Sequence, residues 1–447
     1  MFGHLESGAR IVPSGRTIVL AAGIFTAVTH PGAAQTGGHL EERIASTTDP
    51  SQKYALYLPP GYTRDREWPI LFVLDPRARA VFALRLFQPA ASKLGWVVMS
   101  SHNSVSDSFP DPNEKAMEAM LRSAQERLSI DRSRLYLAGF SGTARAVLRF
   151  AVTLRGHVAG VIAVGGALGF ELGGPETVFA GDSTFAYFGA AGTRDFNYQE
   201  VLAMGDRFGT MHVPFRVAVF DGSHSWPPPE ICSQAIEWLE LRAMRGRHRP
   251  TDSAWVRVRL QTDLARAAEL EQLGQSAEAL RLYEAVTRDY PTSPETSTAA
   301  ERAGKLRNTP AVKYFRAEER KLADWDRRQA ADLQRVLRWA RSQPNPPTSE
   351  SLMRKLEIAK LQETAKRRDS LHAASAQRLL ARIFVWLAFY EPRAYLANHS
   401  PGRALTMFEA ATRIGPIQGE SCALLHAALH AATSEQRMRL SGYCPRD

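Results

Sequence analysis

The stretch 134–150, RLYLAGFSGTARAVLRF, decides how the rest of the chain is interpreted. It begins with an apolar run that predicts a buried strand and ends with a helical pattern. Between the two lie Gly139, Phe140, Ser141 and Gly142. A serine on a sharp turn between a strand and a helix exposes its hydroxyl at the edge of a sheet, where a base can reach it. Ser141 is therefore the candidate nucleophile.

The chain around this stretch alternates apolar strands with helices. We expect strands at 54–58, 69–74, 96–99, 134–140, 160–165, 185–189 and 215–220, and a closing helix at 230–244. Such alternation predicts a mostly parallel sheet flanked by helices on both faces. The helices that follow contain no further strand pattern, so the predicted fold class is α/β followed by an all-α domain.

Three polar residues follow separate predicted strands: Ser141, Asp195 and His224. The carboxyl ends of parallel strands meet at one edge of the sheet, which is where open sheets bind ligands. A serine is a poor nucleophile without a base within reach, and the base needs an acid to fix its tautomer. Asp221 is the nearest rival for the acid, but it precedes a glycine and is better explained by turn formation.

At these residues the sequence resembles the α/β-hydrolase superfamily, in particular its bacterial esterase and polyhydroxyalkanoate-depolymerase-like members. The motifs are LYLPPGY at 56–62, GFSG at 139–142, GTRDFNY at 192–198 and DGSHSWPP at 221–228. The chain order nucleophile, acid, histidine is the one typical of that superfamily. The resemblance implies a Ser141–His224–Asp195 triad that works through an acyl-enzyme.

The expected oxyanion donors are the backbone N–H groups of Gly142 and Arg77, with Ala78 as the alternative to Arg77. Asn103, Phe140 and Trp226 are expected to line the pocket. Two features depart from the superfamily pattern. Thr143 stands where the turn usually has a small residue, which would open the elbow slightly. Asp75-Pro76 replaces a common His-Gly, and proline has no N–H to donate.

Length and composition limit the alternatives. With 447 residues the chain predicts two domains. The net charge is +10, of which roughly +8 lies beyond residue 250. A solvated arginine-rich face explains this charge better than nucleic-acid binding, because no nucleic-acid motif accompanies it. No metal-ligand spacing or nucleotide fingerprint is present, so we expect neither a metal nor a cofactor.

Residues 1–34 predict a secretory signal peptide. Arg10 and Arg16 precede an uncharged stretch at 17–28, and small residues follow near the expected cleavage site at Ala34. That stretch is too short for a membrane span. We expect a periplasmic or secreted protein, the alternative being a cytoplasmic protein with a disordered N-terminus. In an exported chain Cys422 and Cys444 could pair, whereas Cys232 reads as a small buried hydrophobe.

The second half of the chain resembles helical repeats. We expect an α/β-hydrolase domain at 48–246, a linker at 247–253 and a tetratricopeptide-like α-helical domain at 254–447. Ala279, Tyr283 and Pro291 match the second half of such a repeat, and Ala404, Phe408 and Pro416 repeat the offsets. Long helices are expected at 313–342 and 350–387, separated by prolines. The domain is expected to be a stabilising appendage, the alternatives being a protein-docking surface or a cover over the site.

The sequence thus predicts an exported serine hydrolase that cleaves small-molecule or polymeric esters, without nucleic-acid partners. A peptidase or amidase with the same triad is an alternative. So is a helical-repeat interaction module with an inactive hydrolase domain.

Overall fold

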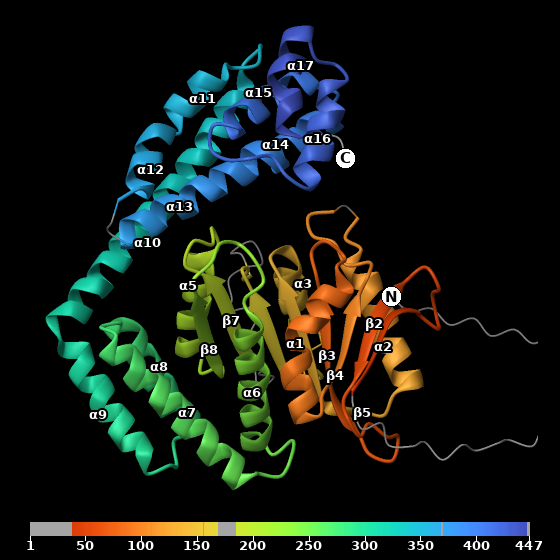
Figure 1. Ribbon diagram of the computed structural model, residues 1–447, viewed down its shortest axis with the longest axis vertical. Coiled ribbons are helices and arrows are strands. Elements are labelled where there is room, and N and C mark those ends of the chain that lie inside the picture. The colour runs from red at the N-terminus through yellow and green to blue at the C-terminus, as the bar shows by residue number, and fades with distance from the viewer. Residues whose placement is uncertain (1–37, 109, 155, 169–184, 368–369, 445–447) are drawn as a thin grey trace, which may run out of the picture.

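The computed structural model describes residues 38–108, 110–154, 156–168, 185–367 and 370–444 (Figure 1). The expected signal peptide at 1–34 lies outside the described residues. Within those ranges no helix combines the length and the apolar character that crossing a bilayer requires.

The first part of the chain builds one eight-stranded sheet in the order β1-β2-β4-β3-β5-β6-β7-β8. Its strands are β1 (His39–Ala45), β2 (Lys53–Leu58), β3 (Trp68–Leu74), β4 (Val97–Ser101), β5 (Ile130–Phe140), β6 (Gly160–Val164), β7 (Ala186–Gly192) and β8 (Phe215–Phe220). The pairs β1–β2 and β2–β4 are antiparallel, and the other pairs are parallel. Strand β1 has no counterpart among the expected strands, because only its Ile44 is buried and no apolar run marks it.

Helices cover both faces of this sheet (Figure 1). One face carries α1 (Ala80–Leu94) and α6 (Pro229–Arg245), and the other carries α2 (Asn113–Arg127), α3 (Gly142–Thr153) and α5 (Tyr198–Thr210). Strand β3 shows why a continuous apolar run predicts a central strand: Phe72 packs into one core and its neighbour Val73 into the other. The sheet, its flanking helices and the helical part that follows confirm the predicted fold class.

The rest of the chain is helical. It contains α7 (Ser253–Gln272), α8 (Ser276–Asp289), α9 (Glu295–Asn308), α10 (Pro310–Ser342), α11 (Ser349–Lys355), α12 (Ile358–Ala365), α13 (Ser370–Val385), η2 (Trp386–Tyr390), α14 (Glu391–Ala397), α15 (Pro401–Ala411), α16 (Glu420–Leu429), α17 (Ser434–Leu440) and η3 (Ser441–Tyr443). Helix α10 corresponds to the helix expected at 313–342. The segment expected at 350–387 is divided, with a break at Glu357, whose φ is 51°.

The repeat-like positions lie in two separate cores. Ala279 and Tyr283 are buried in a cluster shared by α7, α8 and α9. Ala404 and Phe408 are buried in the cluster of the later helices. Both sets thus have the interior position that repeat packing requires, while the tetratricopeptide assignment itself stays a prediction.

A buried ionic cluster joins the helical part to the sheet. Arg216 of β8 donates to Asp263 of α7 and to Asp289 of α8, both at 2.8 Å. The indole of Trp238 on α6 also donates to Asp289, at 3.0 Å. Because β8 is the last strand of the sheet, the α7–α8 pair is fixed to the sheet edge.

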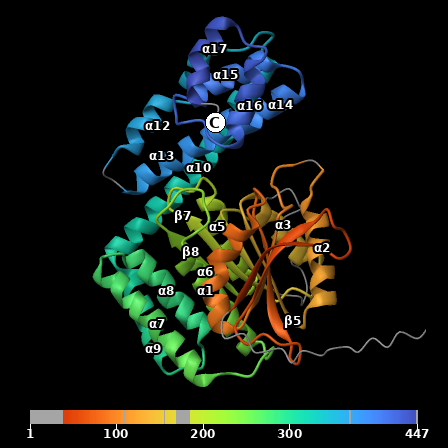
Figure 2. The same ribbon diagram turned by 45° about the vertical axis from the view of Figure 1, so that its right-hand side comes forward.

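The later helices, α11 to α17, form a bundle that lies over the carboxyl ends of the strands (Figures 1 and 2). Helix α10 leads the chain from the sheet edge up to this bundle (Figure 1). A disulfide between Cys422 and Cys444 closes the bundle near the end of the chain, so the pairing expected for an exported chain is present. Cys232 is free and buried.

Candidate active site

Ser141 lies on the turn between β5 and α3 with a strained backbone. Its φ of 57° and ψ of −125° fall outside the regions that non-glycine residues favour. The surrounding backbone holds this conformation, since the N–H of Ser141 donates to Val164 at 2.8 Å. A Cβ on Gly139 would lie 2.4 Å from the carbonyl oxygen of Thr143, so the close approach that an elbow requires occurs there.

The serine, histidine and acid predicted from the sequence are joined by hydrogen bonds. His224 Nε2 lies 2.8 Å from Ser141 Oγ, and His224 Nδ1 lies 2.8 Å from Asp195 Oδ1. A carboxylate can only accept, so Nδ1 carries the ring hydrogen and Nε2 accepts the hydroxyl hydrogen of Ser141. This arrangement places a base on the nucleophile and an orienting acid on the base.

Asp195 is fully buried behind the histidine. Its Oδ1 also accepts the backbone N–H of Asn197 at 2.8 Å, and the Asn197 side chain in turn donates to the carbonyl of Gly165 at 2.8 Å. Gly165 has a φ of 55°, and a Cβ there would lie 2.7 Å from Asp195 Oδ2. Glycine at 165 is therefore part of the site, because any side chain would meet the carboxylate.

The imidazole of His224 lies beside two aromatic rings. Phe140 lies with its ring centroid 4.6 Å from that of His224, and Phe196 lies at 4.1 Å. The histidine side chain is only 18% exposed. Phe140 therefore lies against His224, and its role in lining the pocket stays a prediction. Phe196 was not among the predicted residues, although it directly follows Asp195.

Thr143 fits the elbow without opening it. Its hydroxyl oxygen lies 2.6 Å from the carbonyl of Leu74 and 2.8 Å from that of Phe140, and it accepts the N–H of Phe140 at 3.1 Å. The side chain is fully buried. The expected distortion is thus absent, because the hydroxyl bonds the elbow to the end of strand β3.

The two expected oxyanion donors differ in their present partners. Gly142 is the first residue of α3, and no hydrogen-bond acceptor within the described part of the chain takes its N–H, as is usual at a helix start. The N–H of Arg77 donates to Asp75 Oδ1 at 2.8 Å. Gly142 therefore has a free donor beside Ser141, whereas the N–H of Arg77 is directed at Asp75.

Asp75 connects the loop after β3 with the histidine loop. Its buried carboxylate accepts the indole N–H of Trp226 at 2.9 Å and the guanidinium of Arg79 at 2.8 Å. Trp226 stands two residues after His224, and its ring lies 5.7 Å from that of Phe140. The Asp75 side chain thus anchors both loops.

Asn103 is hydrogen-bonded at the start of strand β2. Its side-chain oxygen accepts the N–H of Lys53 at 2.8 Å, and its amide donates to Ser51 at 3.3 Å. These bonds fix the start of strand β2. The polar side-chain atoms of Asn103 are thus engaged with the backbone, and the expectation that Asn103 lines the pocket stays a prediction.

No group of three His, Cys, Asp or Glu side chains in the described ranges is arranged to hold a metal ion. The side chains and backbone of this site can supply nucleophilic attack by a hydroxyl, proton transfer through an imidazole, and oxyanion binding at a helix start.

Hydrolases are among the solved structures that are similar to this chain. An S-formylglutathione hydrolase from Staphylococcus aureus is 15% identical, with 45% of this chain and 99% of that chain covered and a TM-score of 0.36. An S-formylglutathione hydrolase from Agrobacterium tumefaciens is 15% identical over 47% and 97%, with a TM-score of 0.36. Esterase B from Lactobacillus rhamnosis is 16% identical over 48% and 89%, with a TM-score of 0.37. No protein-family model and no curated protein matches.

Proposed function

We propose that the protein is an exported serine hydrolase that cleaves carboxylic esters. The observation that carries this proposal is the continuous hydrogen-bonded chain from Ser141 through His224 to Asp195, with both bonds at 2.8 Å. The strained elbow supports it, since backbone strain of this kind is costly and is found preferentially at functional sites.

In the proposed reaction, Ser141 Oγ attacks the ester carbonyl while His224 Nε2 takes the hydroxyl proton. The alcohol leaves with that proton, and the acyl group stays on the serine as an ester. In the second half, the oxygen of a water molecule bonds to the acyl carbon while His224 takes a proton from that water. The acyl–serine bond then breaks, the carboxylic acid leaves, and His224 returns the proton to Ser141 Oγ. Asp195 keeps the ring oriented and stabilises the imidazolium in both halves.

The charge that develops on the carbonyl oxygen needs donors in place. The free N–H of Gly142 is the first donor, and one such donor is typically worth a factor of about 10² to 10³ in turnover. Arg77 becomes the second donor only when its N–H turns away from Asp75 toward the substrate. This turn is part of the proposal, since Pro76 has no N–H to offer.

We propose esters rather than amides as substrates because an alcohol is a better leaving group than an amine. Its departure also depends less on exact placement of the proton by His224. The same triad serves peptidases and amidases, so a substrate panel separates the two. Export agrees with the Cys422–Cys444 disulfide, because disulfides persist in oxidising compartments.

The direct test is hydrolysis of p-nitrophenyl butyrate by the purified protein and by Ser141→Ala. We expect the substitution to lower kcat by at least about 10³-fold. Exposed Ser133, which lies before the central part of β5, gives the matched control Ser133→Ala, with activity close to wild type. Unchanged turnover in Ser141→Ala would contradict the proposal.

A further inference from the structure

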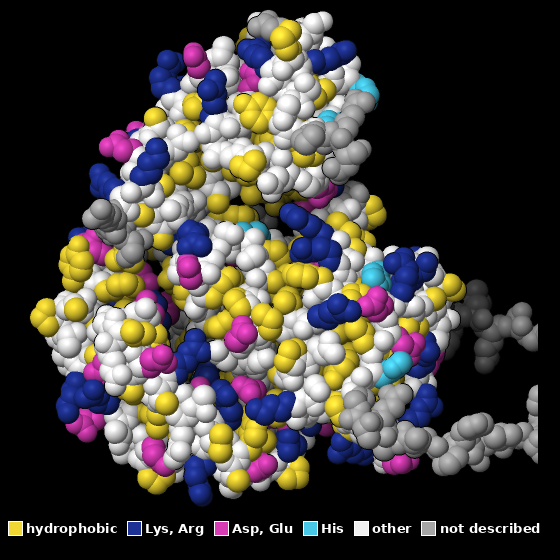
Figure 3. All heavy atoms as spheres, viewed as in Figure 1, with side chains coloured by type: hydrophobic (Ala, Val, Ile, Leu, Met, Phe, Trp, Pro, Cys, Tyr) yellow, Lys and Arg dark blue, Asp and Glu magenta, His cyan; other side chains and the backbone are white. Residues whose placement is uncertain are grey.

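The active site lies beneath the helical bundle. Helix α13, the segment η2 and helix α14 lie on the side of the bundle that faces the carboxyl ends of the strands (Figures 1 and 2). Figure 3 shows a hollow between the bundle and the top of the sheet domain, with Lys and Arg side chains beside it. The bundle therefore stands where it can act on the loops that carry the triad.

Two arginines of α13 bind the turn that contains the acid. Arg378 donates to the carbonyl of Thr193 at 3.0 Å, and Arg382 donates to the carbonyl of Phe196. These carbonyls stand on either side of Asp195 in the sequence. Phe196 also carries the ring that packs on His224. We call residues 193–196, which contain Asp195, the acid turn. The two guanidinium groups thus hold both ends of the acid turn from outside the sheet domain.

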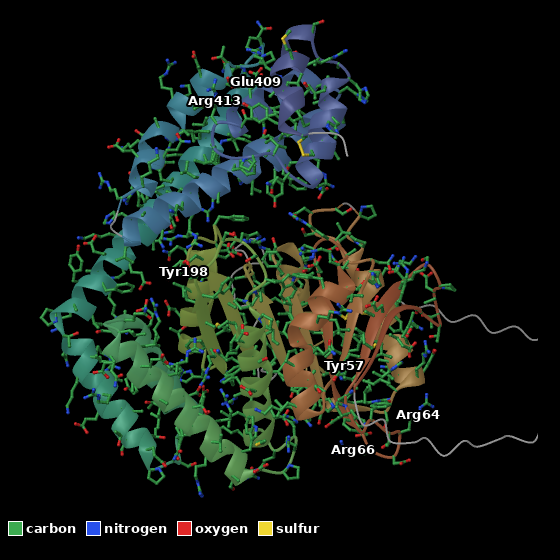
Figure 4. All side chains as sticks on the ribbon, in the orientation of Figure 1. Tyr57, Arg64, Arg66, Tyr198, Glu409 and Arg413 are labelled. Atoms are coloured by element: carbon green, nitrogen blue, oxygen red, sulfur yellow. A yellow bond between two sulfur atoms is a disulfide. The ribbon has the colours of Figure 1, made fainter. Side chains whose placement is uncertain are left out.

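Arg378 is itself fixed by its surroundings. Its guanidinium lies 3.5 Å from Asp326 of α10, and that carboxylate accepts the hydroxyl of Ser375 at 2.5 Å. It also lies 4.7 Å from the ring centroid of Tyr198, the α5 residue labelled in Figure 4. Arg378 is thus a fixed bridge from α10 and α13 to the start of α5.

Arg382 makes its bond to Phe196 from a poorly solvated position, and burial lowers the pKa of its guanidinium. Withdrawing this charged group from water has a cost, which a charge-assisted hydrogen bond offsets. The hydrogen bond from Arg382 to the carbonyl of Phe196 therefore offsets the desolvation of its guanidinium.

The bundle has a second contact on the other side of the nucleophile. The hydroxyl of Tyr390 donates to Asp107 Oδ1 at 3.2 Å, and Arg393 donates to the carbonyl of Asp107. Burial raises the pKa of Tyr390 to about 12, so this hydroxyl stays protonated and able to donate. The neighbouring Ser106 lies against Gly142, where a Cβ would come within 2.4 Å of Ser106 Cβ. The bundle thus also touches the loop beside the proposed oxyanion donor.

We propose that Arg378 and Arg382 are positioning residues that hold Asp195 in its working geometry, so that the helical bundle completes the active site rather than merely stabilising the chain. This inference rests on the proposed hydrolase function. Asp195 works only while it faces His224 Nδ1, and a displacement of about 1 Å at such a site can cost about 10²-fold in rate.

The test compares Arg378→Gln and Arg382→Gln with wild type in the full-length protein, using p-nitrophenyl butyrate. We expect each substitution to lower kcat by about 10- to 100-fold while KM stays within about twofold, because the acid turn orients the base and does not bind substrate. Arg382→Lys should recover part of the loss. The matched control is Arg335→Gln on α10, an exposed arginine paired with Asp332, and it should leave both parameters unchanged.

A double-mutant cycle separates positioning from a general loss of structure. If Arg382 acts through the acid, Arg382→Gln should have less than about threefold effect in an Asp195→Asn background. Melting temperatures of all variants show which of them are folded. Should Arg382→Gln fail to fold, Arg378→Gln in the same two backgrounds provides the comparison.

The outcomes are distinct. A wild-type protein without turnover would overturn the proposed function together with this inference. An active wild type with normal kcat in both glutamine variants would overturn the inference alone. A full-sized effect of Arg382→Gln in the Asp195→Asn background would also overturn it, because the arginine would then act independently of the acid.

Discussion

The hydroxyl oxygen of Thr143 lies 2.6 Å from the carbonyl oxygen of Leu74, which joins the nucleophile turn to the end of strand β3. The N–H of Phe140 completes this group of bonds at 3.1 Å. A residue larger than glycine is tolerated at this position because the close backbone approach is made by Gly139. The side chain at this position of the turn is therefore held by hydrogen bonds.

Thr143→Val should remove these bonds while keeping the side-chain shape. It leaves the N–H of Phe140 and the carbonyl of Leu74 buried without this partner, so we expect a loss of about 1–3 kcal/mol in the free energy of unfolding. Denaturant unfolding of both proteins measures it. Thr143→Ser should retain most of the stability, and Thr153→Val at the exposed end of the same helix is the control. Equal stability of Thr143→Val and wild type would contradict the role given to the hydroxyl.

Gly165→Ala should damage the acid side of the site. An added Cβ would lie 2.7 Å from Asp195 Oδ2, at a φ of 55° that costs a non-glycine residue roughly 1–2 kcal/mol. We expect kcat for p-nitrophenyl butyrate to fall by at least about tenfold, since the carboxylate must move away from His224. Gly304→Ala in helix α9, where a Cβ meets nothing within 4 Å, should leave kcat unchanged. A fully active Gly165→Ala would show that the carboxylate tolerates displacement.

Asp75→Asn should uncouple the loop after β3 from the histidine loop. The amide has one acceptor oxygen in place of two, so it cannot accept from the N–H of Arg77 and from Trp226 with full strength. We expect a loss of roughly 1.5–3 kcal/mol in the free energy of unfolding, the usual range for hydrogen bonds to a charged group, and a lower kcat. Trp226→Phe removes a single one of these bonds and should have the smaller effect on stability. The reverse order of the two variants would argue against the anchoring role of Asp75.

Loss of the disulfide between Cys422 and Cys444 should loosen the bundle. The bond closes a segment with a sequence separation of 22, and a loop of that size is worth about 3 kcal/mol in stability. We expect the double variant Cys422→Ser, Cys444→Ser to unfold at lower temperature. Thiol titration of the denatured wild-type protein should detect Cys232 before reduction and all three cysteines after it. Detection of three thiols without reductant would contradict the pairing.

Much of the fold could be predicted from the sequence, because buried parallel strands are continuous apolar runs. Strand β3 is the clearest case, with all of its residues buried. Strand β1 could not be predicted, since its residues are mostly polar and only Ile44 marks its buried side. A strand that lies at the edge of a sheet needs no apolar run.

The candidate triad could also be predicted, because strand ends converge at one edge and the residue types fit one chemistry. The placement of the helical bundle could not. Arg378 and Arg382 bind carbonyls of the acid turn that lie more than 180 residues earlier in the sequence. The sequence of a helix does not indicate which groups its arginines will contact. The bond between the side chain of Asn103 and the backbone of Lys53 could not be predicted either, because a loop position does not indicate which groups an amide will bind.

The central claim is that Ser141 is an activated nucleophile, and labelling with a fluorophosphonate probe tests it most directly. The probe forms a covalent bond with a serine only where a base activates the hydroxyl. We expect mass spectrometry of the labelled wild-type protein to place the probe on Ser141, with labelling abolished in Ser141→Ala and strongly slowed in a variant that lacks the His224 imidazole. A folded wild-type protein that stays unlabelled, or that carries the label on another residue, would contradict the account.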